Sequence, residues 1–82
     1  MKIQKRQNDP NDMRLIDTKG NILGFIVKWW RYGTWNYRAT IHQPTGIIGD
    51  DWSELDDAVG FILVTHNVMT WDEWSKKKET SP

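Results

Sequence analysis

Alternation between apolar and polar residues predicts two long β-strands in the middle of the chain. Residues 22–30 put one apolar set on a single side: Leu23, Phe25, Val27 and Trp29. Residues 35–42 do the same with Trp35, Tyr37, Ala39 and Ile41. A period of two is typical of strands with one buried face. We therefore expect the wholly apolar set of each strand to face the core.

The loop between these strands decides which side chains meet across them. A three-residue loop at 31–33 places Trp29 opposite Trp35, with the glycine of the loop in the left-handed conformation. A two-residue turn at 32–33 pairs Trp30 with Trp35 instead, and turns the mixed side of residues 22–30 towards the core. Because that second core is poorer in apolar side chains, the pattern favours the three-residue loop.

Helical spacing replaces alternation in the second half of the chain. One stripe recurs at intervals of three and four: Leu55, Ala58, Val59, Ile62 and His66. It predicts a helix from about Glu54 to Thr65 or His66, with Ser53 as the N-cap. Thr70 followed three residues later by Glu73 is a capping box, which predicts a short second helix from Trp71 to about Lys77.

These elements predict one α+β domain over residues 13–78. A short strand at residues 13–17 joins the two long strands through a hairpin turn at residues 19–21, and residues 47–48 can add a few strand residues. The expected fold is a three-stranded antiparallel sheet packed on one helix, plus a short C-terminal helix. Residues 1–12 are polar and contain a strong turn signal, which predicts a flexible N-terminal arm. Residues 79–82 are expected to fray.

Composition adds six tryptophans and no cysteine in 82 residues. The missing cysteines exclude disulfides and thiolate metal sites, and they fit a cytoplasmic location. No apolar run approaches the roughly 20 residues of a membrane span, and the start of the chain lacks an apolar signal region. Large aromatic side chains must then stabilise a small core. Alternation assigns Trp29 and Trp35 to that core, with Trp30 facing outward.

The charged residues indicate what kind of partner this protein could bind. Eleven basic and eleven acidic residues cancel, which counts against purely phosphate-driven binding. The outer face of the predicted sheet nevertheless interleaves basic side chains with an aromatic one, a pattern that can hold phosphates and stack on a base. The candidate nucleic-acid-binding residues are Arg14, Lys28, Trp30, Arg31, Arg38 and Thr40.

Residues 28–41, Lys-Trp-Trp-Arg-Tyr-Gly-Thr-Trp-Asn-Tyr-Arg-Ala-Thr-Ile, resemble the central hairpin of the plant ethylene-response type of DNA-binding domain. Residues 49–59 resemble the run that opens the helix of that domain, and the N-terminal arm-binding domain of tyrosine integrases is similar in shape. The resemblance covers roughly residues 13–66. It implies a three-stranded sheet in the DNA major groove with the helix behind it, so DNA is expected rather than RNA. The matching contact positions are Lys28, Trp30, Arg31, Arg38 and Thr40.

Catalysis is not expected. The two histidines, His42 and His66, have no motif around them, and no nucleophile elbow surrounds Ser53. The acidic run at residues 50–57 lacks the spacing of a calcium loop. We therefore expect no enzyme, no cofactor and no metal.

A protein-interaction module is the alternative function, for example an accessory or inhibitor protein of a phage or another mobile element. Trp71 and Trp74 lie three residues apart on one helical face and could anchor a protein partner, since tryptophan is enriched at interface hot spots. The acidic helix start could meet a basic partner, and a homodimer is a further arrangement. The same two tryptophans could instead clamp the last segment onto the domain.

Overall fold

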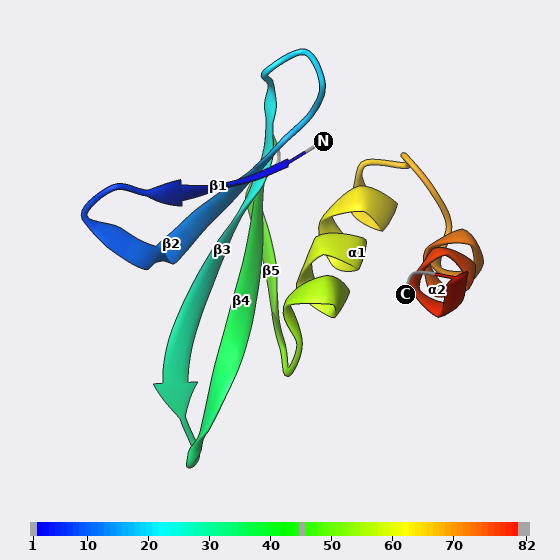
Figure 1. The fold of residues 1–82 in the computed structure, drawn as a ribbon. Coiled ribbons are helices and arrows are strands. Elements are labelled where there is room, and N and C mark those ends of the chain that lie inside the picture. Colours follow the sequence, from blue (N-terminus) through cyan, green and yellow to red (C-terminus); the bar gives the residue numbers. More distant parts are fainter. Residues whose placement is uncertain (1, 45, 81–82) are drawn as a thin grey trace.

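The computed structural model describes residues 2–44 and 46–80 of the chain. The elements run in the order β1 (Lys2–Arg6), β2 (Asp9–Ile16), β3 (Ile22–Arg31), β4 (Thr34–Gln43), β5 (Gly46–Trp52), α1 (Leu55–Thr65) and α2 (Trp71–Thr80). The five strands form one antiparallel sheet whose spatial order is the chain order. Helix α1 covers one face of this sheet, and α2 packs on the side of α1 away from the sheet (Figure 1).

The chain is α+β, as predicted, but the three-stranded sheet is wrong. Residues 2–6, predicted to belong to a flexible arm, form β1 and pair with β2. Residues 46–52 form a full strand, β5, along the other edge. Every residue of β1 is exposed, and so is every residue of β5 except the half-buried Trp52. Because neither edge strand buries a wholly apolar side, its sequence lacks the alternation of apolar and polar residues that predicts a strand.

The turn between β3 and β4 has two residues, not the predicted three. Tyr32 (φ 55°) and Gly33 (φ 75°) both adopt the left-handed conformation, which is that of a type I′ turn. Trp30 therefore pairs with Trp35, and Trp29 pairs with Asn36. Since one step of register reverses the side chains of a whole strand, this turn exchanges the two predicted faces of β3.

The core consequently contains the other set of β3 side chains. Ile26 is fully buried, whereas Phe25 is half-buried and Val27 is exposed. Gly24 lies against Ile62 of α1, and a Cβ added at position 24 would come within 3.0 Å of the Ile62 Cδ1 atom. Gly24, which lowers the apolar content of this side of β3, is the place where α1 approaches the sheet. The core cluster is Met13, Leu15, Ile26, Ala39, Ile41, Ala58, Val59, Ile62 and Leu63.

The helices begin and end close to the predicted residues. The N-cap of α1 is Glu54 in an extended conformation without a side-chain capping hydrogen bond, so the predicted Ser53 cap is wrong. At the other end, His66 Nε2 donates to the backbone carbonyl oxygen of Leu23. The capping box of α2 is confirmed, because the Glu73 amide donates to Thr70 Oγ1 at 3.2 Å and the Thr70 amide donates to Glu73 Oε1 at 3.3 Å. Helix α2 extends to Thr80, and the last two residues of the predicted tail lie outside the described residues.

Candidate functional site

The side of the sheet opposite α1 is the candidate site, and we call it the open face. None of the described elements covers it (Figure 1). Cross-strand partners share a face, so the register defines two rows across it. The first row is Gln4, Arg14, Phe25, Thr40 and Gly49, and the second is Asp12, Val27, Arg38 and Asp51.

An arginine–aspartate pair joins β4 to β5 on the open face. The guanidinium of Arg38 donates to Asp51 through Nε at 2.9 Å and through Nη2 at 3.2 Å. These hydrogen bonds lower the pKa of the Asp51 carboxyl, with smaller contributions from the Trp29 indole and the charge of Arg31. The pKa of Arg38 is raised for the same reason. The two hydrogen bonds thus fix the position of the Arg38 guanidinium, and the Asp51 carboxylate balances part of its positive charge.

Trp29 lies under two guanidinium groups at the same place. The Arg38 group is 4.5 Å from the ring centroid and the Arg31 group is 5.0 Å from it, distances at which cations interact with an aromatic face. The prediction that Trp29 is a core residue is therefore wrong. Trp29 is a half-buried side chain on the open face. Its ring orients two arginines from strands that the sheet holds side by side.

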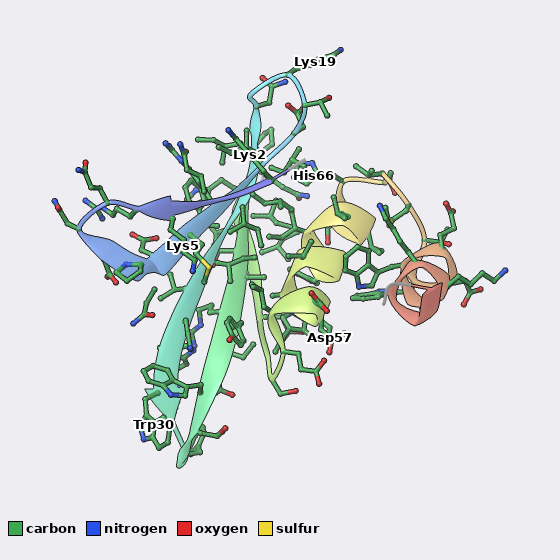
Figure 2. The ribbon with its side chains drawn as sticks, viewed as in Figure 1. Lys2, Lys5, Lys19, Trp30, Asp57 and His66 are labelled. Atoms are coloured by element: carbon green, nitrogen blue, oxygen red, sulfur yellow. The ribbon has the colours of Figure 1, made fainter. Side chains whose placement is uncertain are left out.

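A hollow of about 480 Å³ lies at the β1–β2 end of the open face. The β1–β2 hairpin extends away from α1 (Figure 1). Lys5, Arg6, Arg14 and Phe25 line the hollow, and Figure 2 shows Lys5 on this hairpin. Arg14 Nε donates to Gln4 Oε1 at 2.6 Å, and Arg6 forms an ion pair with Asp12 at 3.2 Å. The hollow therefore brings together the side chains of Arg6, Arg14 and Asp12, and Lys5 borders it from β1.

The structure separates the predicted nucleic-acid-binding residues. Arg14, Arg38 and Thr40 lie together on the open face. Lys28 and Trp30 lie on the α1 side, so the single outer face predicted for them is wrong. The cause is again the two-residue turn, which reverses the predicted faces of β3. Arg31 ends β3 at the hairpin tip and reaches Trp29 and Tyr32 with its guanidinium.

The end of the β3–β4 hairpin carries exposed rings, which we call the aromatic tip: Trp30, Tyr32 and Trp35. The two tryptophan rings meet edge to face at 5.3 Å, and 58% of Trp30 and 43% of Trp35 remain exposed. The Lys28 ammonium lies 4.9 Å from the Trp35 ring centroid. Figure 2 shows Trp30 at the end of the hairpin, well away from α1.

Trp71 and Trp74, the predicted partner anchors, hold α2 against α1. Trp74 is half-buried beside Gly60, where an added Cβ would come within 2.5 Å of the indole nitrogen. Trp71 packs against Trp52 with ring centroids 5.6 Å apart and stays 39% exposed. The contacts of both side chains are thus within the domain, and their role towards a partner stays a prediction.

The balanced net charge hides a division along the chain. Residues 1–49 contain eight of the eleven Lys and Arg and three of the eleven Asp and Glu, a formal charge of +5. Residues 50–82 contain the remaining three basic and eight acidic residues, a formal charge of −5. The positive part builds β1 to β4, and the negative part builds the end of β5 and both helices. A count over the whole chain could not show this, although a running count along the sequence would have.

Reasoning from the sequence also missed residues of the open face, namely Arg6, Phe25, Trp29 and Asp51. Phe25 packs edge to face on His42 at 5.4 Å. The signal that could have found Phe25 and Trp29 was Gly24, since a glycine inside a strand often marks close backbone approach. Asp51 gave no such signal, because its partner Arg38 lies thirteen residues away on a neighbouring strand.

Comparisons with protein-family models, with curated proteins and with solved structures found no match. The resemblance to the ethylene-response and integrase arm-binding domains therefore stays a prediction. Within the described residues, no helix has the length and apolar character needed to cross a membrane. Over the same part of the chain, no group of three or more His, Asp or Glu side chains could hold a metal ion.

Proposed function

We propose that this protein is a small nucleic-acid-binding module, and that its open face binds duplex DNA. The observation that carries the proposal is the division of charge, with +5 in residues 1–49, which build β1 to β4, and −5 in residues 50–82, which build the end of β5 and the helices. A positive surface attracts the phosphate backbone and releases its counterions. The acidic helix layer lies on the other side of the sheet, so it orients the open face towards the DNA.

Two groups of side chains give the proposed contacts their positions. Arg6 and Arg14 lie at the hollow near the β1–β2 hairpin and would bind phosphate oxygens there. Arg31 and Arg38 lie over the Trp29 ring at the other end of the face. Contacts of this kind set the position of the protein along the backbone of the duplex.

A duplex fits the open face better than a single strand does. Proteins that bind single strands stack bases on accessible aromatic rings. On the open face, Trp29 already interacts with two guanidinium groups, and Phe25 packs against His42. The aromatic side chains of this face therefore position other protein groups, which leaves the basic side chains to contact phosphates.

Titration of a fluorescein-labelled 20-base-pair duplex, followed by anisotropy, tests the proposal. We expect binding at low salt that weakens steeply as salt increases. Arg14→Ala combined with Arg31→Ala should weaken binding and reduce the salt dependence. Lys76→Ala removes one positive charge from α2 and serves as the control, with binding close to wild type. Absence of binding to duplex DNA at low salt would overturn the proposal.

A protein-interaction module is the second candidate, and the aromatic tip favours it. Exposed tryptophan and tyrosine side chains beside Lys28 and Arg31 match the composition of interface hot spots. An accessory or inhibitor protein acting in the cytoplasm would fit this second candidate function. Capture of a defined partner should be lost on Trp30→Ala and retained on Ile22→Ala, which truncates an exposed side chain away from the tip. Equal loss in both variants would contradict it.

A further inference from the structure

The two edges of the sheet differ in their protection against pairing. Strand β1 has three basic residues among five, and its register shifts between Lys5 and Arg6. Basic side chains and irregular register are the usual means by which natural sheets keep an edge from pairing. The β1 edge is therefore protected.

Strand β5 lacks basic residues and an irregular register, and its charges are confined to Asp50 and Asp51 near its C-terminal end. It contains no lysine, arginine or proline, and its register with β4 is uninterrupted from Gly46 to Trp52. Ile47 is 66% exposed and Ile48 is 42% exposed, one on each face of the sheet. A regular edge strand whose first four residues are uncharged, and which pairs on one side with β4, leaves a row of backbone groups as a template for a further strand.

We infer that β5 pairs antiparallel with β5 of a second copy of this chain, which gives a two-fold symmetric dimer with one continuous ten-stranded sheet. Two identical antiparallel strands are self-complementary, so one surface supplies both halves of the contact. The inference does not depend on the proposed function.

The charges of β5 favour a second copy of the chain as the pairing partner, and they determine the register of the two strands. The carboxylates of β5, Asp50 and Asp51, are both at its C-terminal end, while its N-terminal end is uncharged. Antiparallel pairing with Ile48 opposite Ile48 brings Asp50 opposite Gly46, so that the acidic ends of the two strands lie apart. Parallel pairing would align the carboxylates of the two copies, and like charges directly opposite are destabilising.

The symmetry also determines how the rest of each copy lies. A two-fold axis perpendicular to the sheet keeps both α1 helices on one side and both open faces on the other. Such a contact is smaller than a standard interface of roughly 1,600 Å². We therefore expect a dimer that dissociates on dilution to low micromolar concentration.

Sedimentation velocity over a range of concentrations tests the dimer. The wild-type protein should shift from monomer to dimer between micromolar and millimolar concentration. Ile48→Lys should stay monomeric, whereas Ile22→Lys, which changes an isoleucine of similar exposure (46%) on β3, should still dimerise. A wild-type protein that stays monomeric at millimolar concentration, or an Ile48→Lys variant that dimerises like wild type, would overturn the inference.

A second measurement keeps the inference testable if Ile48→Lys fails to fold. Amide hydrogen exchange of the wild-type protein should slow in β5, and not in β1, as concentration increases. Because the chain has no cysteine, Ile48→Cys introduces a single thiol. A short bis-maleimide should link two copies of Ile48→Cys and leave Ile22→Cys unlinked. Exchange in β5 that is independent of concentration, or equal linking of both cysteine variants, would contradict pairing through β5.

Discussion

Gly60 of α1 and Trp74 of α2 are packed so closely that a Cβ at position 60 would lie 2.5 Å from the Trp74 indole nitrogen. The same Cβ would lie 2.9 Å from the Trp71 ring. A glycine in the interior of a helix costs about 1 kcal/mol relative to alanine. The contact with α2 offsets that cost, since α2 can approach α1 only where the side chain is absent.

The first prediction concerns this contact. Gly60→Ala should lower the free energy of unfolding, because the added methyl group displaces Trp74 and loosens α2. In a background that carries both Trp71→Ala and Trp74→Ala, the same change should increase the free energy of unfolding by about 0.5–1 kcal/mol, since both rings that an added Cβ would meet are gone and only the helix propensity remains. Urea denaturation of wild type and of the Trp71→Ala, Trp74→Ala variant, each with and without Gly60→Ala, measures this reversal of sign. If Gly60→Ala were stabilising in both backgrounds, Trp74 would not be packed on Gly60.

The second prediction concerns the β3–β4 turn. Tyr32 has a φ of 55°, which costs about 1 kcal/mol or more for a residue with a Cβ, whereas asparagine tolerates this conformation. Tyr32→Asn should therefore raise the melting temperature. Gly33→Ala should lower the free energy of unfolding by about 1–2 kcal/mol through the backbone alone, since nothing lies within 4 Å of the added Cβ. A stabilising Gly33→Ala would be incompatible with the two-residue turn.

The third prediction separates stability from binding. Asp51→Asn removes the negative charge that balances Arg38. Stability should fall only slightly, because the two side chains are 47% and 41% exposed and surface ion pairs contribute little. Duplex binding should become tighter, and its salt dependence steeper, because Arg38 is released to contact phosphate. Anisotropy titration of both proteins checks this, and weaker binding by Asp51→Asn would count against a phosphate-binding role for Arg38.

The fourth prediction is a pH dependence with a definite sign. Hydrogen bonds from Arg38 lower the pKa of Asp51 below its ordinary value of 3.8. The unfolded state therefore binds a proton on this group at a higher pH than the folded state does. The stabilising contribution is complete above about pH 3.8, and it is lost as pH falls through the lowered folded-state pKa. The difference in unfolding free energy between wild type and Asp51→Asn should shrink on acidification below that pH, as measured by urea denaturation.

The amphipathic α1 and the capping box of α2 were predictable, because each signal lies within one short continuous segment of the chain. Thr70 and Glu73 satisfy each other's backbone amides, so four consecutive residues suffice to recognise the start of α2. The strands β3 and β4 were predictable within a residue or two for a similar reason, since alternation is a local property.

The faces of those strands were not predictable by counting apolar side chains. The register depended on Tyr32, a non-glycine residue in a left-handed conformation. It also depended on Gly24, where the absence of a side chain lets α1 approach the sheet. Both effects concern backbone geometry, which hydrophobicity does not report. The candidate site depends on the same register, so its residues were divided between two faces.

The order of the strands in the sheet has a consequence for how the protein folds. Each strand pairs only with its neighbours along the chain, so the whole sheet is a succession of hairpins. Loop closure between such neighbours is entropically cheap, and folds dominated by local contacts form quickly. During synthesis the positively charged strands emerge first, and they can pair before α1 exists to cover their apolar side. For that interval Ile26, Ala39 and Ile41 would be solvent-exposed, which makes the nascent sheet the stage at which this chain is most prone to aggregate.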